Sequence, residues 1–247
     1  MLFLNPKTLF ALPFSRLVFL LCYCSSVMAE WHGEVSFRSD YVYHGYSKSR
    51  GNPVAQADLN YVSDSGWYAG SGLSQVSFDD HVNPSYSALE VKPYAGVNLP
   101  IDDDWHTNLA TTGYVYNSKV FSEDADYVDF SASLHYQDWI SGKVILAPDA
   151  YQRHATVPSY DLNLRHDLAD DFQLSAGLGY SQAKALFRQD YFYWNVGASW
   201  YLTRYLVVDM RYVDVQLHNY PADGAYPDYF YPRPVENKYL FSVSLGF

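Results

Sequence analysis

Apolar and polar residues alternate along most of this chain. In the last segment, Tyr239, Phe241, Val243, Leu245 and Phe247 are apolar at every second position, and mostly small or polar residues stand between them. Successive side chains of a β-strand point to opposite faces, so this pattern predicts a strand with one apolar and one polar face.

The same alternation recurs often enough to predict twelve strands. Nine segments show it clearly: 34–43, 55–61, 89–99, 128–136, 160–165, 172–180, 192–202, 206–212 and 238–247. Three further segments are less regular: 67–78, 105–116 and 140–147. A tilted strand needs about 9–11 residues to cross a bilayer, and most of these segments come close to that length.

The connections alternate between short and long. The short ones are 63–66, 100–104, 137–139, 169–171 and 203–204, and the long ones are 44–53, 79–87, 117–126, 148–158, 182–190 and 216–237. Outer-membrane barrels have short periplasmic turns and long extracellular loops. With the amino terminus in the periplasm, every long connection falls on the extracellular side.

These patterns predict an all-β fold, a transmembrane antiparallel up-and-down β-barrel of about 12 strands. An even number of strands is typical of bacterial barrels, and closure pairs every backbone group in lipid. Aromatic residues near strand ends would form the two interfacial girdles: Tyr41, Tyr43, Tyr61, Trp67, Trp105, Tyr136, Trp139, Tyr160, Phe172, Tyr180 and Tyr191. A soluble secreted β-sandwich is the alternative, since it also alternates.

Residues 1–29 have the composition of a cleavable signal peptide. Lys7 and Arg16 precede or flank an apolar run over 17–24, and small or aliphatic residues end the segment at Ala29. Cleavage after Ala29 would leave residues 30–247 as the barrel domain. A lipoprotein or a retained anchor is the alternative, although Cys22 and Cys24 lack a small residue before them.

Composition narrows the possible chemistry. The formal net charge is -11, and removing the signal would leave 14 of the 16 basic residues and all 27 acidic ones. Such a chain is not expected to bind nucleic acid. Its two cysteines lie in the signal, its eight histidines are scattered, and no glycine-rich nucleotide loop is visible, so we expect no cofactor and no metal.

The inward-facing charged positions are the first candidate site. By strand parity they are Arg38, Asp40, Asp58, Glu90, Lys92, Asp129, His135, Lys143, Asp161, Arg165, Asp209 and Arg211. They would line a passage that sorts solutes by charge and size. Alternatively, they would pair with one another and fill the barrel.

The long loops hold two further candidates. Tyr226, Tyr229, Phe230 and Tyr231 are interleaved with prolines, and this loop would fold inward as a constriction whose rings attract cations, or else would cap the rim. Acidic groups over 79–80, 123–126 and 223–228 would bind divalent cations or bias the mouth towards cations, unless they are ordinary solvated charge.

An outer-membrane hydrolase is the enzymatic alternative. Ser133, His135 and Asp129 share the inward face of one predicted strand. At about 3.4 Å per residue, the spacing puts Ser133 and His135 about 7 Å apart, beyond hydrogen-bond reach unless the side chains lean together. The Gly-x-Ser-x-Gly signature is absent. We therefore predict no catalytic residues.

Three motifs resemble those of the TorF-like porins, a family of proteobacterial outer-membrane proteins. They are the segment 39–47 (SDYVYHGYS), the segment 65–70 (SGWYAG) leading to 77–79 (SFD), and the segment 90–96 (EVKPYAG). The similarity runs through the whole predicted mature chain. It implies a small outer-membrane porin that serves small methylamine-type solutes.

Together these observations predict an integral protein of the bacterial outer membrane, with its long loops extracellular. Its function would be passive diffusion of small hydrophilic solutes, with a preference for cations or methylamine-type solutes. A closed structural or surface-binding barrel is the main alternative. The expected partners are outer-membrane lipid, lipopolysaccharide, small solutes and the barrel-assembly machinery, which would read Tyr239, Phe241, Val243, Leu245 and Phe247.

Overall fold

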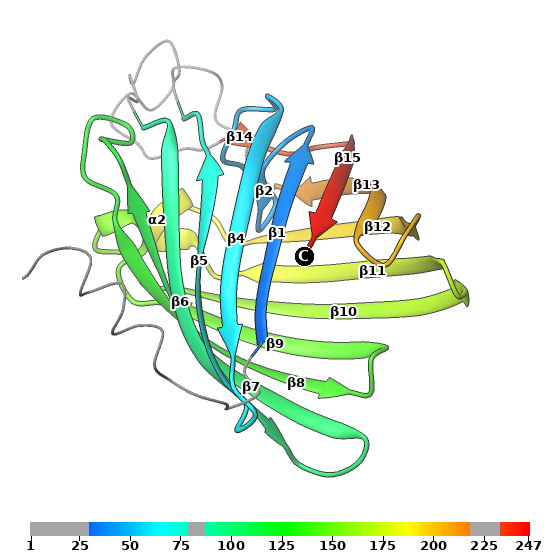
Figure 1. Ribbon diagram of the computed structural model, residues 1–247. Helices are drawn as coiled ribbons and strands as arrows, with labels where there is room; N and C mark the ends of the chain where they lie inside the picture. The colour runs from blue at the N-terminus through cyan, green and yellow to red at the C-terminus, as the bar shows by residue number, and fades with distance from the viewer. Residues whose placement is uncertain (1–29, 79–86, 218–232) are drawn as a thin grey trace, which may run out of the picture.

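A closed ring of twelve antiparallel strands forms the body of this protein (Figure 1). The computed structural model describes residues 30–78, 87–217 and 233–247. The expected signal segment, residues 1–29, lies outside the described residues, and its cleavage stays a prediction. The predicted fold class, a twelve-stranded up-and-down barrel, is confirmed.

Each barrel strand pairs with its neighbours along the chain, and β1 closes the ring against β15. Val35 of β1, for example, lies opposite Leu245 of β15 on one side and Ala57 of β4 on the other. The barrel strands are β1 (Glu30–Arg38), β4 (Val54–Val62), β5 (Trp67–Gln75), β6 (Leu89–Pro100), β7 (Trp105–Tyr116), β8 (Tyr127–Tyr136), β9 (Ile140–Ala147), β10 (Val157–Ala169), β11 (Phe172–Ser181), β12 (Tyr191–Tyr201), β13 (Leu206–Gln216) and β15 (Lys238–Gly246).

The outer face of the ring is apolar and exposed. Phe130, Leu162 and Phe241 each expose between 44% and 53% of their surface, although large apolar side chains are normally buried in a soluble domain. The polar members of the alternation point into the barrel instead. The arrangement matches a barrel whose outside faces lipid and whose inside holds polar side chains.

The connections separate by length between the two ends of the barrel. All the short turns lie at one end, the short-turn end, and the described long connections lie at the other, the long-loop end (Figure 1). Trp31, Trp67, Trp105, Trp139 and Trp200 are exposed near the short-turn end. This placement is typical of an interfacial aromatic girdle.

A small second sheet and two short helical segments complete the fold. The sheet joins β2 (Val42–Tyr43), β3 (Tyr46–Ser47) and β14 (Arg233–Pro234). The helical segments are η1 (Ala150–Gln152) and α2 (Lys184–Phe187). Among the described residues, no helix is long and apolar enough to cross a membrane.

The first strand is shorter than its sequence predicts. The alternation suggests a strand over 34–43, but β1 ends at Arg38. Ser39 interrupts the apolar face, and His44 and Gly45 both adopt positive φ values, which turn the chain between β2 and β3. Residues 39–53, called the inner loop below, therefore leave the wall and enter the barrel.

Buried apolar side chains gather inside the long-loop end of the barrel. They include Tyr46 from the inner loop, Phe187 from α2 and Tyr151 from η1, packed with Tyr114 and Tyr127 from the wall. A core inside one end of the lumen is possible only because the inner loop fills it. The functional question therefore concerns what the inner loop leaves open.

Candidate functional site: the barrel lumen

The inner loop crosses the lumen and contacts well-separated parts of the wall. The Tyr41 hydroxyl donates to Glu90 of β6 at 2.8 Å, and the Tyr43 hydroxyl donates to Asp129 of β8 at 3.2 Å. On another side, Lys238 of β15 donates to Asp40 at 2.8 Å. The loop is thus fixed at several points around the ring rather than along one edge.

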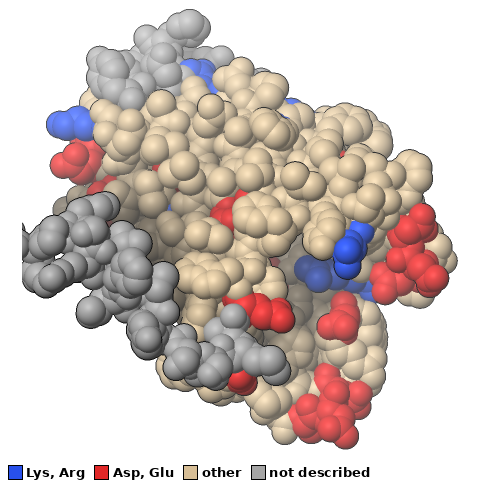
Figure 2. Space-filling model, viewed as in Figure 1, with Lys and Arg blue, Asp and Glu red and all other residues tan. Residues whose placement is uncertain are grey.

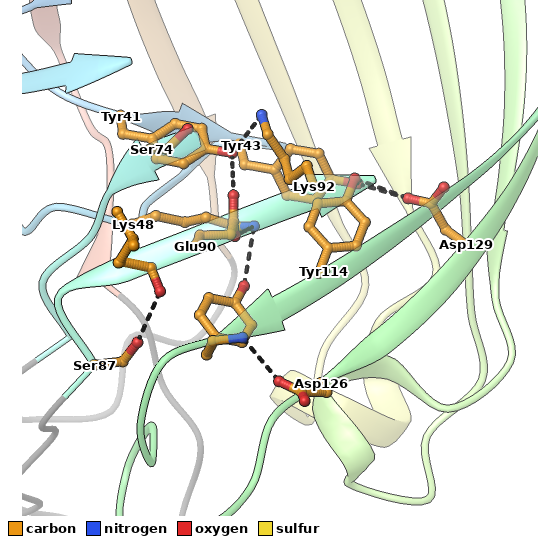
Figure 3. Close-up of polar contacts among 12 residues, drawn as sticks. Tyr41, Tyr43, Lys48, Ser74, Ser87, Glu90, Lys92, Tyr114, Asp126 and Asp129 are labelled. Atoms are coloured by element: carbon orange, nitrogen blue, oxygen red, sulfur yellow. Dashed lines mark hydrogen bonds and ion pairs between the residues drawn. The ribbon is translucent and has the colours of Figure 1, made fainter. Parts of the chain in front are cut away.

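Lys48 is the most deeply held residue of the inner loop. Its ammonium group lies 2.6 Å from Glu90 and donates to the Tyr116 hydroxyl at 3.2 Å (Figure 3). Only 2% of its side chain is exposed, and Glu90 is fully buried. Burial lowers the pKa of Lys48 even though Glu90 opposes that shift.

Five tyrosine rings surround the Lys48 ammonium. The ring centres of Tyr114 and Tyr43 lie 4.4 and 4.6 Å from it, and three more rings, those of Tyr41, Tyr116 and Tyr151, lie within 5.8 Å. Such contacts stabilise a desolvated cation. The rings replace part of the hydration that Lys48 gives up.

Tyrosine hydroxyl groups also satisfy the inward carboxylates. Asp129 accepts hydrogen bonds from Tyr43 and, at 2.9 Å, from Tyr114 (Figure 3). Asp161 accepts from Tyr193 at 2.6 Å. Burial raises the pKa of the Tyr41 hydroxyl well above its usual value, and the negative charge of Glu90 raises it further. The hydroxyl therefore keeps its proton and remains a donor.

His44 is held between two aromatic rings. It stacks on Tyr43 with ring centres 4.0 Å apart and on Tyr193 of β12 at 5.6 Å. Its Nε2 lies 3.8 Å from Asp161 of β10. Burial lowers the pKa of His44 to about 4, because the cost of desolvating the charged ring exceeds the attraction of Asp161.

Short hydrogen bonds fix the base of the inner loop. Asp40 accepts from the hydroxyl groups of Ser47 at 2.5 Å and Ser49 at 2.6 Å. Pro234 of β14 lies opposite Tyr46 of β3, so the segment before β15 continues the same small sheet. The inner loop therefore follows the first barrel strand in the chain and pairs with the segment that precedes the last one.

The short-turn half of the lumen remains open. A cavity of about 560 Å³ there is lined by Arg38, Asp58 and Lys92, together with small polar residues such as Ser36 and Asn60. A second cavity, of about 200 Å³, lies between the inner loop and β12, β13 and β15. In Figure 2 the molecule is hollowed, with Lys and Arg side chains on the wall of the hollow and Asp and Glu around its margin.

The predicted inward residues all lie inside the barrel, but in three different settings. Arg38, Asp58, Lys92, Asp209 and Arg211 line the two cavities. Glu90, Asp129 and Asp161 are covered by the inner loop, and Asp40 belongs to the loop itself. His135, Lys143 and Arg165 occupy inward positions of β8, β9 and β10 in the open half, since they alternate with exposed apolar residues.

Several of these charges are paired. Arg211 donates to Asp209 at 3.2 Å and to Ser175 at 3.0 Å, and it also contacts Asn195. Lys48 pairs with Glu90, and Lys238 pairs with Asp40. The lumen therefore contains both arrangements that the sequence left open: mutually paired ions, including Arg211 and Asp209 beside the smaller cavity, and unpaired charges that face a cavity.

The structure corrects the expected positions of three aromatic residues. The sequence places Tyr41, Tyr43 and Tyr191 in the outer girdles, but Tyr41 and Tyr191 are buried inside. Tyr43 belongs to the Lys48 cluster, which comprises Lys48 and the five tyrosine rings around its ammonium group. Parity fails for the first two because they follow the end of β1. Tyr191 begins β12 on its inward face, beside Tyr46.

The proposed constriction by Tyr226, Tyr229, Phe230 and Tyr231 falls outside the described residues, and so do acidic positions 79–80 and 223–228. In the acidic group over 123–126, Glu123 pairs with Arg153, and Asp126 accepts a hydrogen bond from the Tyr116 backbone N–H at 2.8 Å. These two acids serve loop structure. Within the described residues, the inner loop narrows the lumen together with η1 and α2, which pack against it.

The side chains of Ser133 and His135 lean together, which is the exception that the strand spacing left open. Ser133 Oγ lies 2.9 Å from His135 Nε2, because the two side chains lean towards each other across one strand. His135 stacks on His106 with ring centres 4.5 Å apart. Among the described residues, no carboxylate accepts a hydrogen bond from His135, so the pair lacks the third group of a catalytic triad.

Sequence reasoning missed the residues that close the long-loop end. No local pattern singles out Lys48, Tyr114, Tyr116 or Tyr151, and His44 falls in the long connection 44–53 and in the motif 39–47 without a role of its own. One signal was available: Ser39 breaks the apolar alternation, and a glycine, which favours turns, follows at Gly45. These signs place a turn before Tyr46 but do not say where it points.

The described residues contain no group of three or more His, Cys, Asp or Glu side chains placed to hold a metal ion.

The closed ring, its apolar exterior and its polar interior define the class: an outer-membrane-type β-barrel with a porin fold.

Similar folds occur in solved channels. The KdgM porin in complex with disordered oligogalacturonate aligns with a TM-score of 0.54 at 8% identity, over 88% of this chain and 99% of that one. The NanC porin aligns with a TM-score of 0.51 at 10% identity, over 88% and 99%. An outer membrane channel from Pseudomonas putida F1 aligns with a TM-score of 0.51 at 13% identity, over 99% of each chain.

The chain belongs to the Gcw_chp family, described as bacterial protein of unknown function, whose pattern matches residues 25–241. A search of curated proteins finds no match. The match establishes the family and the solved channels establish the fold, whereas the TorF-like resemblance stays a prediction.

Proposed function

We propose that this protein is a porin-like channel of the bacterial outer membrane through which small hydrophilic solutes diffuse passively. The observation that carries the proposal is the open, polar cavity of about 560 Å³ in a barrel whose outer face is apolar. A cavity gives up the packing contacts that side chains would make if they filled the lumen. The open, polar short-turn half of the lumen is therefore best explained by the passage of solutes.

The second cavity supports a route past the inner loop. It lies along β12, β13 and β15, beside His44 and Gly45, and it shares Arg38 with the larger cavity. A solute would therefore pass along one side of the loop. The channel would be narrow, because the opposite side is filled by the Lys48 cluster.

Location and orientation belong to the same proposal. The apolar exterior and the tryptophans near the short-turn end support insertion in an outer membrane with the long loops extracellular. We also propose that residues 1–29 are removed after Ala29, that the barrel-assembly machinery reads the last alternation, and that lipopolysaccharide surrounds the long-loop end.

Single-channel recording tests the proposal. The full chain would be expressed in a Gram-negative host, purified from the outer-membrane fraction and inserted into a planar bilayer. Discrete current steps are expected. Recovery in the outer-membrane fraction without steps would contradict the channel and would favour the closed structural or surface-binding barrel.

A cation preference and methylamine-type solutes remain predictions of the sequence. They rest on the acidic composition and on the family resemblance, and the sign of the reversal potential in a salt gradient measures the first of them.

The hydrolase alternative has one observation in its favour, the 2.9 Å contact between Ser133 and His135. Phospholipid and peptide hydrolysis by the purified chain would support it only if the activity were lost in His135→Ala. We expect no such activity.

A further inference from the structure

Arg38 is a lining residue of both lumen cavities. It is the last residue of β1, its side chain is exposed to the lumen, and it lines both the cavity of about 560 Å³ and that of about 200 Å³. A solute that moves from one cavity to the other passes this guanidinium group.

The guanidinium group of Arg38 is not neutralised by a carboxylate. Its one hydrogen bond in the described structure is from Nε to Ser36 Oγ at 3.4 Å, and no described carboxylate oxygen lies within 4.0 Å of it. Lys92 lines the same cavity and donates to the Tyr41 hydroxyl at 3.1 Å, again without an ion pair. Two cations without an ion pair therefore face the open space, which the carboxylates of Glu34 and Asp58 also line.

The carboxylates that line the two cavities with Arg38 already have donors, and Glu34 of β1 accepts from the Ser244 hydroxyl at 3.1 Å. Asp40 accepts from two serines and from Lys238. Asp58 accepts from the Tyr94 hydroxyl at 2.6 Å. Asp209 accepts from Ser199 at 2.8 Å and from Arg211. Carboxylates with hydrogen-bond donors of their own attract a passing cation less than free ones would.

The opposite wall repeats the arrangement. In the ring, β9 lies six strands from β1 in either direction, so Lys143 faces the side of the lumen that carries Arg38. Arg165 follows on β10, and neither Lys143 nor Arg165 forms an ion pair with a described residue. Asp161 lies opposite Lys143 in the register of β9 and β10, but its carboxylate already accepts a hydrogen bond from the Tyr193 hydroxyl.

We infer that the lumen selects anions, and that Arg38 is the residue that determines this selectivity for small solutes bearing a carboxylate or phosphate group. A guanidinium group presents a fork of N–H donors that matches both groups. The inference rests on the proposed channel function and deepens it. It is opposite to the cation preference expected from composition, because composition does not distinguish lumen charges from those elsewhere.

The test is the reversal potential of single channels in a KCl gradient. We expect the chain to pass chloride more readily than potassium. Arg38→Gln should lower the chloride-to-potassium permeability ratio by about twofold or more, and Arg38→Glu should bring it below one, since one lumen charge dominates a narrow passage. Lys184→Gln, on the exposed surface of α2, is the matched control and should leave the ratio unchanged.

Adding sodium acetate or sodium phosphate separates the two ligand chemistries. Each anion should reduce the current of the unaltered channel, and the one that binds more tightly identifies the group. Arg38→Gln should weaken that block. Lys143→Gln, on another strand, should lower the permeability ratio independently, which keeps the test valid if Arg38 variants do not fold.

The outcomes are distinct. Current steps with a cation preference, or a preference unchanged in both Arg38 variants and in Lys143→Gln, would overturn the anion inference and leave the channel standing. Absence of steps would overturn the channel and, with it, this inference.

Discussion

The ammonium group of Lys48 lies 2.6 Å from the carboxylate of Glu90, and both side chains are shut away from water inside the barrel. One belongs to the inner loop and the other to the wall. The pair therefore fixes the loop across the lumen, where it closes one part of the cross-section and leaves another open.

Removing one member of this pair should release the inner loop. Lys48→Met leaves Glu90 buried without its cation, which typically costs about 3–5 kcal/mol. We expect a larger single-channel conductance and a lower denaturant midpoint. Replacing both residues, as in Lys48→Met with Glu90→Leu, should recover much of the lost stability. An unchanged conductance in Lys48→Met would show that the loop does not limit the passage.

Acid should loosen the same loop through His44. The pKa of His44 is about 4 in the folded protein, lowered by burial, whereas an exposed histidine has a pKa near 6.5. The released loop therefore binds a proton first, and the docked loop loses stability as the pH falls from about 6.5 to about 4. The full loss is about 3 kcal/mol, because one pKa unit corresponds to about 1.4 kcal/mol.

The measurement is single-channel conductance between pH 7 and pH 4. The charged groups that act on His44 are Asp161, Lys48 and Lys143. His44→Gln is the control, and it should remove the part of the pH-dependent change in conductance that comes from the inner loop. A pH profile that is the same in His44→Gln would refute the assignment.

Gly45 should tolerate no side chain. Its φ of +79° is unfavourable for other residues, and an added Cβ would lie 2.9 Å from the Cβ of Tyr193. Gly45→Ala should destabilise docking of the inner loop by about 1–3 kcal/mol. Gly142→Ala is the matched control, since nothing lies within 4 Å of the added atom there. Equal denaturation midpoints for the two variants would contradict the close packing of the loop.

The outer face should reject charge despite its exposure. Leu162 is 44% exposed on the outer face of β10, and arginine on a lipid-facing strand costs about 2–4 kcal/mol near the bilayer midplane. Leu162→Arg should therefore fold poorly in lipid vesicles. The same substitution at the neighbouring inward position, Asn163→Arg, should be tolerated better. A reversal of this order would argue against a membrane-facing exterior.

The number of strands, their order and the faces they present could be read from the sequence. The alternation of period two decides these features locally, because each strand must place apolar side chains outward and pair its backbone with its neighbours. Of the predicted inward charges, Asp58, Lys92 and Arg211 lie where parity places them.

The inner loop could not be read in the same way. Asp40, Tyr41 and Tyr43 continue the alternation of β1, yet they leave the wall and meet residues far away in the sequence. Whether a loop folds over the rim or into the lumen depends on partners such as Glu90, Asp129 and Lys238, which only closure of the ring brings together.

The sequence by itself therefore determined a twelve-stranded barrel with a charged interior, since those features follow from local periodicity. Only the tertiary structure decided which charges are neutralised and which face open space. Pairing depends on distances of a few ångströms between strands, as for Lys48 and Glu90 or for the unpaired Arg38, and no local pattern encodes those distances.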